Sequence, residues 1–204
     1  EYSGLFSFAM SISIVFWAVA LWGGRTYQVS DVKREFSSGG YIAVRFVTSL
    51  LVAVTAMMFC VLSGYSTTKT GLIMILVGFK ILESVADSLY GILQIQGRLY
   101  ITGISLTMKA VFGFGAFMLV DVLTKNIIYG TLAILLVNLL VIIFYDILWM
   151  RRVENVVINK KLFKKYVSQA VVIMKRTAVV FIVVFLTMFS LNIPRYFLDK
   201  SHPD

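Results

Sequence analysis

The segment Ile127–Leu148, IIYGTLAILLVNLLVIIFYDIL, decides the fold class, because it is almost wholly apolar and long enough to cross a bilayer. A membrane-spanning helix needs about 20 mostly apolar residues to cross a hydrocarbon core of about 30 Å. The sequence therefore predicts an all-α integral membrane protein, a polytopic bundle of about six transmembrane helices. The other expected helices are Gly4–Trp22, Tyr41–Ser63, Gly71–Leu93, Ile101–Leu123 and Thr177–Ile193, the last closed by Pro194.

The overall composition supports a membrane protein. Hydrophobic residues make up 59% of the 204 residues and charged residues only 14%, whereas a soluble domain is about half apolar and a quarter charged. A chain of this length cannot hide such an excess in one core, so apolar side chains are expected to face lipid. One cysteine, Cys60, and one histidine, His202, offer no metal cluster. We therefore expect no metal, no cofactor, no catalytic residues and no enzymatic activity.

The basic residues gather in particular loops, which explains the net charge of +9 without a nucleic-acid partner. The loops at Gly23–Gly40, Arg98 and Trp149–Arg176 carry twelve Lys and Arg residues and would lie on one side. The other side carries four. The positive-inside rule places the richer side in the cytoplasm. The first expected helix then runs inward from outside, which predicts that an upstream helix is missing.

Charge and hydropathy divide the chain into three parts. Residues 1–148 form the expected transmembrane bundle, and residues 177–204 form a further helix. Residues 149–176 join them as a basic amphipathic linker, suited to the cytoplasmic leaflet. A solvated linker is the alternative. The apolar face carries Phe163, Val167, Ala170 and Val171, and Lys160, Lys161, Lys164 and Lys165 surround it.

Polar residues follow one face of the expected helix Gly71–Leu93. Lys80, Glu83 and Asp87 are spaced i, i+3 and i+7, and Gln94 extends the stripe. Ionisable groups at membrane depth are costly and usually face a cavity or a partner. The stripe predicts a water-filled cavity; a Lys80–Glu83 pair that only locks helix packing is the alternative.

Two neighbouring helices each add a cation, Arg45 and Lys109, although Arg45 alone could also extend its head group to the interface. With Lys80, they predict an interior suited to an anionic, hydrated substrate such as a pyrophosphate head group. Glu83 and Asp87 are the expected groups for coupling transport to H⁺ or Na⁺. Arg195, near the far end of the last helix, is assigned to an outer rim.

Three segments resemble a known family. Leu21–Arg45 reads LWGGRTYQVSDVKREFSSGGYIAVR, Tyr90–Ser105 reads YGILQIQGRLYITGIS, and the chain closes near Asn192-Ile193-Pro194-Arg195-Tyr196. They are similar to helix junctions of bacterial polysaccharide flippases, in the multidrug/oligosaccharidyl-lipid/polysaccharide exporter superfamily. The first junction carries the pattern through Arg25, Tyr27, Val29, Ser30, Asp31, Tyr41 and Arg45.

The resemblance implies most of one lobe of a two-lobe transporter, holding that family's second to seventh helices. Its members move an undecaprenyl-pyrophosphate-linked oligosaccharide to the outer leaflet of the bacterial plasma membrane by alternating access, alongside polysaccharide polymerase partners. Arg45 matches a position that opens a cavity-lining helix; the other polar residues are placed in the cavity by spacing alone. A chain with half the cavity wall missing is not expected to transport by itself.

Three other functions remain as alternatives. A cation-coupled drug exporter of the same superfamily would favour an acidic cavity, whereas here three cations face two carboxylates. A membrane-embedded polyprenyl-phosphate transferase would need clustered carboxylates for a metal, and Glu83 and Asp87 have Lys80 beside them. A non-catalytic scaffold would leave the charged stripes on three helices unexplained.

Overall fold

The computed structural model describes residues 2–154, 156 and 160–201. It is 89% helical, and the described part contains no strand, which confirms the all-α class. The helices in chain order are α1 (Tyr2–Leu21), α2 (Gly24–Ser30), α3 (Ser38–Leu62), α4 (Thr67–Ile95), α5 (Leu99–Thr124), α6 (Ile127–Val141), the π-helical turn η1 (Ile142–Asp146), α7 (Ile147–Val153) and α8 (Lys160–Ser201).

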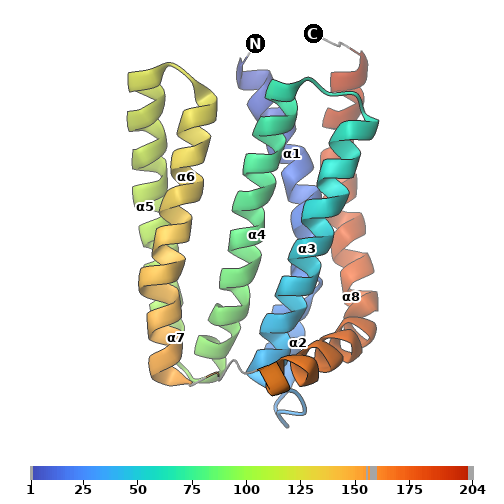
Figure 1. The fold of residues 1–204 in the computed structure, drawn as a ribbon, viewed down its shortest axis with the longest axis vertical. Coiled ribbons are helices and arrows are strands. Elements are labelled where there is room, and N and C mark those ends of the chain that lie inside the picture. Colours follow the sequence, from blue (N-terminus) through green and yellow to red (C-terminus); the bar gives the residue numbers. More distant parts are fainter. Residues whose placement is uncertain (1, 155, 157–159, 202–204) are drawn as a thin grey trace.

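The long helices stand side by side as an up-and-down bundle (Figure 1). α4 lies in the middle and packs against α1, α3 and α6, while α8 packs along α1 and α3. α5 and α6 form a helical hairpin, which η1 and α7 continue. Short connections make consecutive helices antiparallel neighbours, as is usual in helical bundles.

Turn chemistry that is visible in the sequence sets several helix ends. Ser37, Ser66 and Asn126 are N-caps whose side chains accept hydrogen bonds from backbone N–H groups one turn into α3, α4 and α6. After α3 and α4 the chain reverses at Gly64 and Gly97, with φ of 66° and 71°. Glycine adopts this left-handed backbone without a steric penalty, so both helices stop there.

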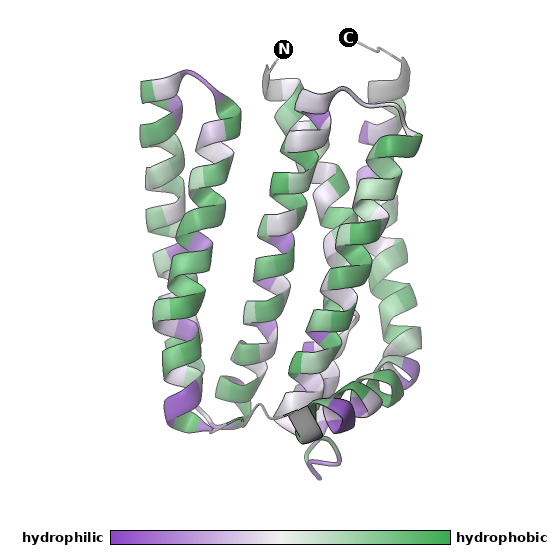
Figure 2. Cartoon of the chain, in the orientation of Figure 1, coloured by the Kyte–Doolittle hydropathy of each residue, from purple (hydrophilic) through white to green (hydrophobic). Residues whose placement is uncertain are grey.

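Apolar side chains cover the outside of the bundle, which supports a multi-pass membrane protein. Among the described residues, five helical segments are long and apolar enough to cross a membrane: Gly4–Ser30, Ser38–Leu62, Leu99–Thr124, Ile127–Val153 and Leu162–Phe197. Hydrophobic residues dominate these segments in Figure 2. α4 is missing from this set because three of its four charged residues, Lys80, Glu83 and Asp87, lie close together near its middle. Most of its other residues are buried or half-buried by neighbouring helices.

Small residues allow the central helices to approach closely. Ala9 and Ala20 in α1 and Ala56 in α3 have no exposed surface, and they pack where α1, α3 and α4 meet. Association of helices in lipid relies on such close packing, because lipid tails leave little hydrophobic driving force between helices. Larger apolar residues such as Leu72, Ile73 and Leu76 of α4 fill the remaining space in this core.

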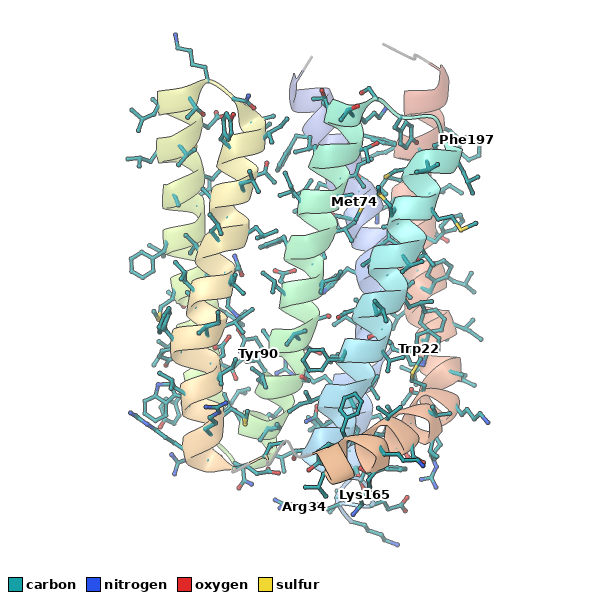
Figure 3. All side chains as sticks on the ribbon, viewed as in Figure 1. Trp22, Arg34, Met74, Tyr90, Lys165 and Phe197 are labelled. Atoms are coloured by element: carbon teal, nitrogen blue, oxygen red, sulfur yellow. The ribbon has the colours of Figure 1, made fainter. Side chains whose placement is uncertain are left out.

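The three basic connections all lie at one end of the bundle, as the sequence predicts. Figure 1 shows the segments before α3, between α4 and α5, and at the start of α8 at the lower end. Figure 3 shows Arg34 and Lys165 there, and Phe197 at the opposite end. The arrangement of the loops therefore agrees with the charge count from which their shared side was inferred.

The last part of the chain differs from the expected division. Both expected boundaries, 148/149 and 176/177, fall inside helices, because α7 extends to Val153 and α8 runs unbroken through residue 176. Pro194 does not end α8, which continues to Ser201. A proline in a helix removes one N–H donor and strains the turn before it, but it does not always stop the helix.

α8 bends sharply, so that its first part crosses the lower end of the bundle (Figure 1). Beside the bend, the indole Nε1 of Trp22 donates to the Met174 carbonyl at 3.0 Å, and the Trp22 ring stacks on Phe181 at 3.9 Å. The Thr177 hydroxyl donates to the Ile173 carbonyl. A side-chain group that donates to a main-chain carbonyl competes with the helix's own N–H to C=O hydrogen bonds, and this favours bending. The amphipathic segment is thus continuous with the last long helix.

Candidate functional site

The first polar cluster surrounds Asp87 on α4. Arg25 on α2 donates from Nη1 to Asp87 Oδ1 at 3.2 Å, and Arg45 on α3 donates from Nη2 to Oδ2 at 2.7 Å. Arg25 also donates to Gln94 Oε1, one of the bonds being 2.9 Å long. Two arginines share one carboxylate, so the cluster carries one net positive charge inside the bundle.

The guanidinium group of Arg45 is buried and forms hydrogen bonds with two neighbouring helices. Its side chain is 2% exposed, and its Nη1 also donates to the carbonyls of Ala20 and Leu21 at the end of α1. Helix ends leave carbonyls without internal partners, and the break between α1 and α2 supplies them here. The Arg45 guanidinium is therefore buried and bonded to both α1 and α4.

The second cluster joins α4, α5 and η1 around Lys109. The Lys109 ammonium donates to Asp146 Oδ2 and to the Tyr90 hydroxyl oxygen, both at 2.6 Å. The Tyr90 hydroxyl lies 2.8 Å from Ser105 Oγ and 3.3 Å from Asp146 Oδ2. The guanidinium of Arg25 lies 6.0 Å from the centre of the Tyr90 ring. The second cluster therefore adjoins the first, through Tyr90.

The third cluster is a pair further along α4. Lys80 Nζ lies 2.7 Å from Glu83 Oε2 and 4.8 Å from the centre of the Trp17 ring on α1. The Glu83 side chain is about a third exposed, whereas Lys80 is largely buried. Such a pair can form within one helix turn without any ligand. The structure thus contains the Lys80–Glu83 pair that the sequence analysis gave as the alternative, and the water-filled cavity stays a prediction.

The three cations expected in a common interior are each paired with a carboxylate: Arg45 with Asp87, Lys80 with Glu83, and Lys109 with Asp146. The expected coupling groups differ from each other, because Asp87 has both oxygens bonded to arginines, while Glu83 has a partly exposed carboxylate. Desolvating a charge in a helical bundle is costly unless it is paired, which explains this arrangement.

Arg195 lies away from these clusters, near the other end of α8. Its Nη1 donates to Ser11 Oγ on α1 at 2.7 Å. This bond ties the far part of α8 to α1. An outer-rim role for Arg195 stays a prediction.

Arg25, Asp146 and Tyr90 hold these clusters together but are not among the expected site residues. Arg25 is a loop charge and part of the first helix junction in the sequence analysis, but not an expected cavity residue, because the segment after Trp22 has no apolar run of its own. Asp146 stands alone in the most apolar of the expected helices, and that isolation was the available signal. Nothing in the sequence pointed to Tyr90 as a site residue, since tyrosine is common near membrane interfaces.

Outside the membrane-spanning segments, Asp31 organises the connection between α2 and α3. Burial acts to raise the pKa of its carboxyl group. Hydrogen bonds from the N–H groups of Glu35 and Phe36 and from the Tyr41 hydroxyl, with Arg176 nearby, outweigh burial and hold the pKa below its ordinary value of 3.8. The loop is therefore tied to its own ionised carboxylate.

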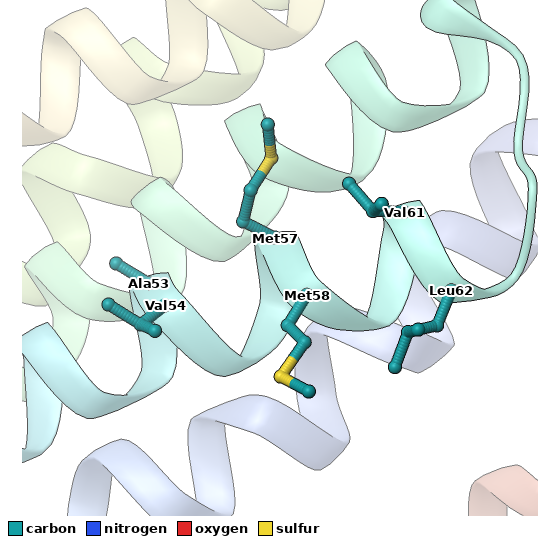
Figure 4. Close-up of a pocket in the computed structure, with 6 residues that line it drawn as sticks. All are labelled: Ala53, Val54, Met57, Met58, Val61 and Leu62. Atoms are coloured by element: carbon teal, nitrogen blue, oxygen red, sulfur yellow. The ribbon is translucent and has the colours of Figure 1, made fainter.

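An apolar depression on α3 has a different character from the clusters. It is lined by side chains of one helix, as Figure 4 shows, and those side chains face out of the bundle. Such a surface fits contact with lipid tails and offers no group to an anion. Its lining residues are Ala53, Val54, Met57, Met58, Val61 and Leu62. Within the described residues, no three acidic, histidine or cysteine side chains come together as metal ligands.

No family model, curated protein or solved structure shows a significant match to the chain.

Proposed function

We propose that this chain is part of a membrane transporter that moves an anionic, lipid-linked glycan across a bacterial plasma membrane by alternating access. The lipid is proposed to be undecaprenyl pyrophosphate, and the chain to form most of one lobe of a flippase. The proposal draws on the resemblance of the helix junctions and on the polar clusters. It includes α4 as a sixth crossing helix.

The net positive charge of the Asp87 cluster is the observation that carries the proposal. Arg25 and Arg45 together exceed the charge of Asp87, and Gln94 adds a neutral acceptor rather than a second anion. A buried excess cation lowers the cost of bringing a phosphate group to membrane depth. The guanidinium group is also suited to phosphate oxygens, because its N–H donors form a planar fork.

Exposure distinguishes the two arginines. The Arg25 side chain is 31% exposed and the Arg45 side chain 2%. Arg25 can therefore turn toward an anion while Arg45 continues to neutralise Asp87. An exchange of partners of this kind lets substrate binding favour one arrangement of the helices over another, as alternating access requires. An organic cation would instead meet repulsion at the same place, so a drug exporter for cations fits less well.

The test is a deletion of the encoding gene in its own host, followed by measurement of surface polysaccharide and of lipid-linked precursor in the inner leaflet. We expect surface polymer to fall and the precursor to accumulate. The gene carrying Arg25→Met should reproduce this effect, because the buried carboxylate then neutralises the remaining arginine.

Lys33→Met is the matched control, since it removes one positive charge from the same end of the bundle at an exposed loop position. The gene carrying Lys33→Met should restore the normal amounts of surface polysaccharide and of lipid-linked precursor. If the deletion leaves both pools unchanged, the glycan proposal is wrong. If the deletion instead sensitises cells to organic cations, the drug-exporter alternative takes its place.

A further inference from the structure

Asp146 is the most deeply buried carboxylate among the described residues, and one of its oxygens has no partner. Its exposed fraction is 0%, and Oδ2 is bonded to Lys109 and Tyr90. Oδ1 has no hydrogen-bond partner in the structure. A buried polar atom without a partner is costly, and rare enough to need an explanation. An anionic oxygen at membrane depth is costlier still.

The backbone around Asp146 is specialised. Asp146 is the last residue of the π-helical turn η1, which interrupts an otherwise α-helical rod from Ile127 to Val153. A π turn shifts the register of the side chains that follow it, and such turns occur frequently at functional sites. Here Ile143 and Phe144 face outward, while Asp146 points into the interface with α4 and α5.

A metal ion does not suit the open oxygen. A metal ion needs several ligands at once, whereas Oδ2 of this carboxylate already accepts a hydrogen bond from the Lys109 ammonium at 2.6 Å, and no group of three acidic, histidine or cysteine ligands occurs in the described part of the chain. A proton forms a covalent O–H bond and needs no cage of ligands. The titratable and charged groups facing the site are Lys109 from α5, Tyr90 and Glu83 from α4, Arg25 from α2, and the adjacent Tyr145.

We propose that Asp146 is a proton-binding site that switches the charge of the Lys109 cluster. Hydronium from the aqueous phase transfers one proton to Oδ1: one O–H bond of hydronium breaks, one O–H bond forms on Asp146, and a water molecule is released. Asp146 becomes a neutral acid, the ion pair becomes a hydrogen bond from the charged Lys109 ammonium to a neutral carboxyl group, and the cluster changes from zero net charge to +1. A role for the released charge in attracting an anionic glycan rests on the proposed function; the proton site does not.

The site differs from the pair that the sequence singled out for ion coupling. Both oxygens of Asp87 are bonded to arginines that would have to leave before it gained a proton. Glu83 is partly exposed beside Lys80 and so has access to water. Asp146 alone of these three combines complete burial with a free oxygen.

Infrared difference spectroscopy on the chain in lipid vesicles tests the proposal directly. On stepping from neutral to acidic pH, the wild-type protein should gain the carbonyl band of a buried, protonated carboxylic acid. Glu83→Gln and Asp87→Asn should keep this band, and Asp146→Asn should lose it. Asp146→Glu should retain the band at a shifted frequency, because it preserves the acid.

Isotopic labelling of aspartate carboxyl carbons covers the case in which Asp146→Asn does not fold. The wild-type band should then shift with the label, as an aspartate band must. Absence of the band in wild-type protein, or its persistence in folded Asp146→Asn, would overturn the proposal. None of these measurements depends on transport, so they separate failure of the proton site from failure of the flippase proposal.

Discussion

At the scale of single residues, the charged side chains were predictable but most of their partners were not. Helical spacing placed Lys80, Glu83 and Asp87 on one face of α4, and the structure keeps them there. Spacing within one helix says nothing of what another helix presents. The pairing of Asp87 with Arg25 and Arg45 arises because α2 and α3 meet α4 at that level. The sequence thus indicated polar positions, and tertiary packing decided their charge balance.

The two arginines on Asp87 should contribute unequally to stability. Arg45→Met removes a buried cation, leaves the half-buried Asp87 carboxylate with one arginine, and takes the Arg45 donor from two α1 carbonyls. Breaking a buried ion pair lowers the free energy of unfolding by about 3–5 kcal/mol. Because Arg25 still pairs with Asp87, we expect the loss to be about 3 kcal/mol. Arg25→Met should cost about 1 kcal/mol, because its side chain is partly exposed. Denaturant unfolding of each variant in detergent measures the difference, and equal losses would contradict this assignment of roles.

Asp31 should make the stability of the α2–α3 connection depend on acid. Its pKa is lower in the folded protein than its ordinary value of 3.8. A carboxylate with a depressed pKa stabilises the folded state above the unfolded pKa, and that contribution disappears as the pH falls through the folded pKa. Thermal unfolding of wild-type and Asp31→Asn protein at several pH values measures it. Wild type should be the more stable near neutral pH, and the gap should close in acid; a gap independent of pH would rule out the carboxylate as its source.

At the scale of elements, helices with clear end signals were predicted well. The expected helices Tyr41–Ser63 and Ile101–Leu123 match α3 and α5 within a few residues, because Ser37, Gly64 and Gly97 define nearby ends. η1 and the continuity of α8 were not predicted. A π turn has no established sequence signature, and residues 160–176 are polar enough to read as a separate segment although nothing breaks the helix after them. Distant contacts, such as that of Trp22 with Met174, shape the bend.

The contact between α3 and the start of α8 should depend on Gly39. A Cβ atom there would lie 2.5 Å from the Tyr166 ring, so Gly39→Ala forces that ring away from α3. We expect a loss of about 1–3 kcal/mol, as for other overpacked sites. Gly103→Ala in α5 is the control, because nothing lies within 4 Å of its Cβ position. It should gain about 0.5–1 kcal/mol from helix propensity.

Unfolding of the two alanine variants in detergent compares these effects, and proteolysis near residues 154–162 reports whether the start of α8 has detached. Trimming Tyr166 to alanine in the Gly39→Ala background should recover part of the loss. A stable Gly39→Ala protein with unchanged proteolysis would show that the contact between Gly39 and Tyr166 is not tight.

At the scale of the whole molecule, the sequence was sufficient for the membrane class, because outward apolar surface is a matter of composition and length. The number of membrane crossings is harder to predict from the sequence. α4 has the length of a spanning helix, yet its charges are paired inside the bundle rather than absent. A hydropathy average penalises every charged residue, even one that is paired inside the bundle. A spanning helix with a polar interior face therefore appears less apolar than its neighbours. Whether α4 crosses decides the sidedness of everything after it.

We predict that α4 crosses the membrane, with the α3–α4 and α5–α6 connections outside and the α4–α5 connection in the cytoplasm. Single cysteines replacing Thr68, Arg98 and Lys125, all exposed, test this in a Cys60→Ala background, since Cys60 is the sole native thiol. A membrane-impermeant thiol reagent added to intact cells should label positions 68 and 125 and should reach position 98 only after the cells are opened. If α4 lies on the surface instead, positions 68 and 98 would be labelled together and position 125 would be protected. The two labelling patterns differ at both position 98 and position 125, because each membrane crossing reverses the side of every later connection.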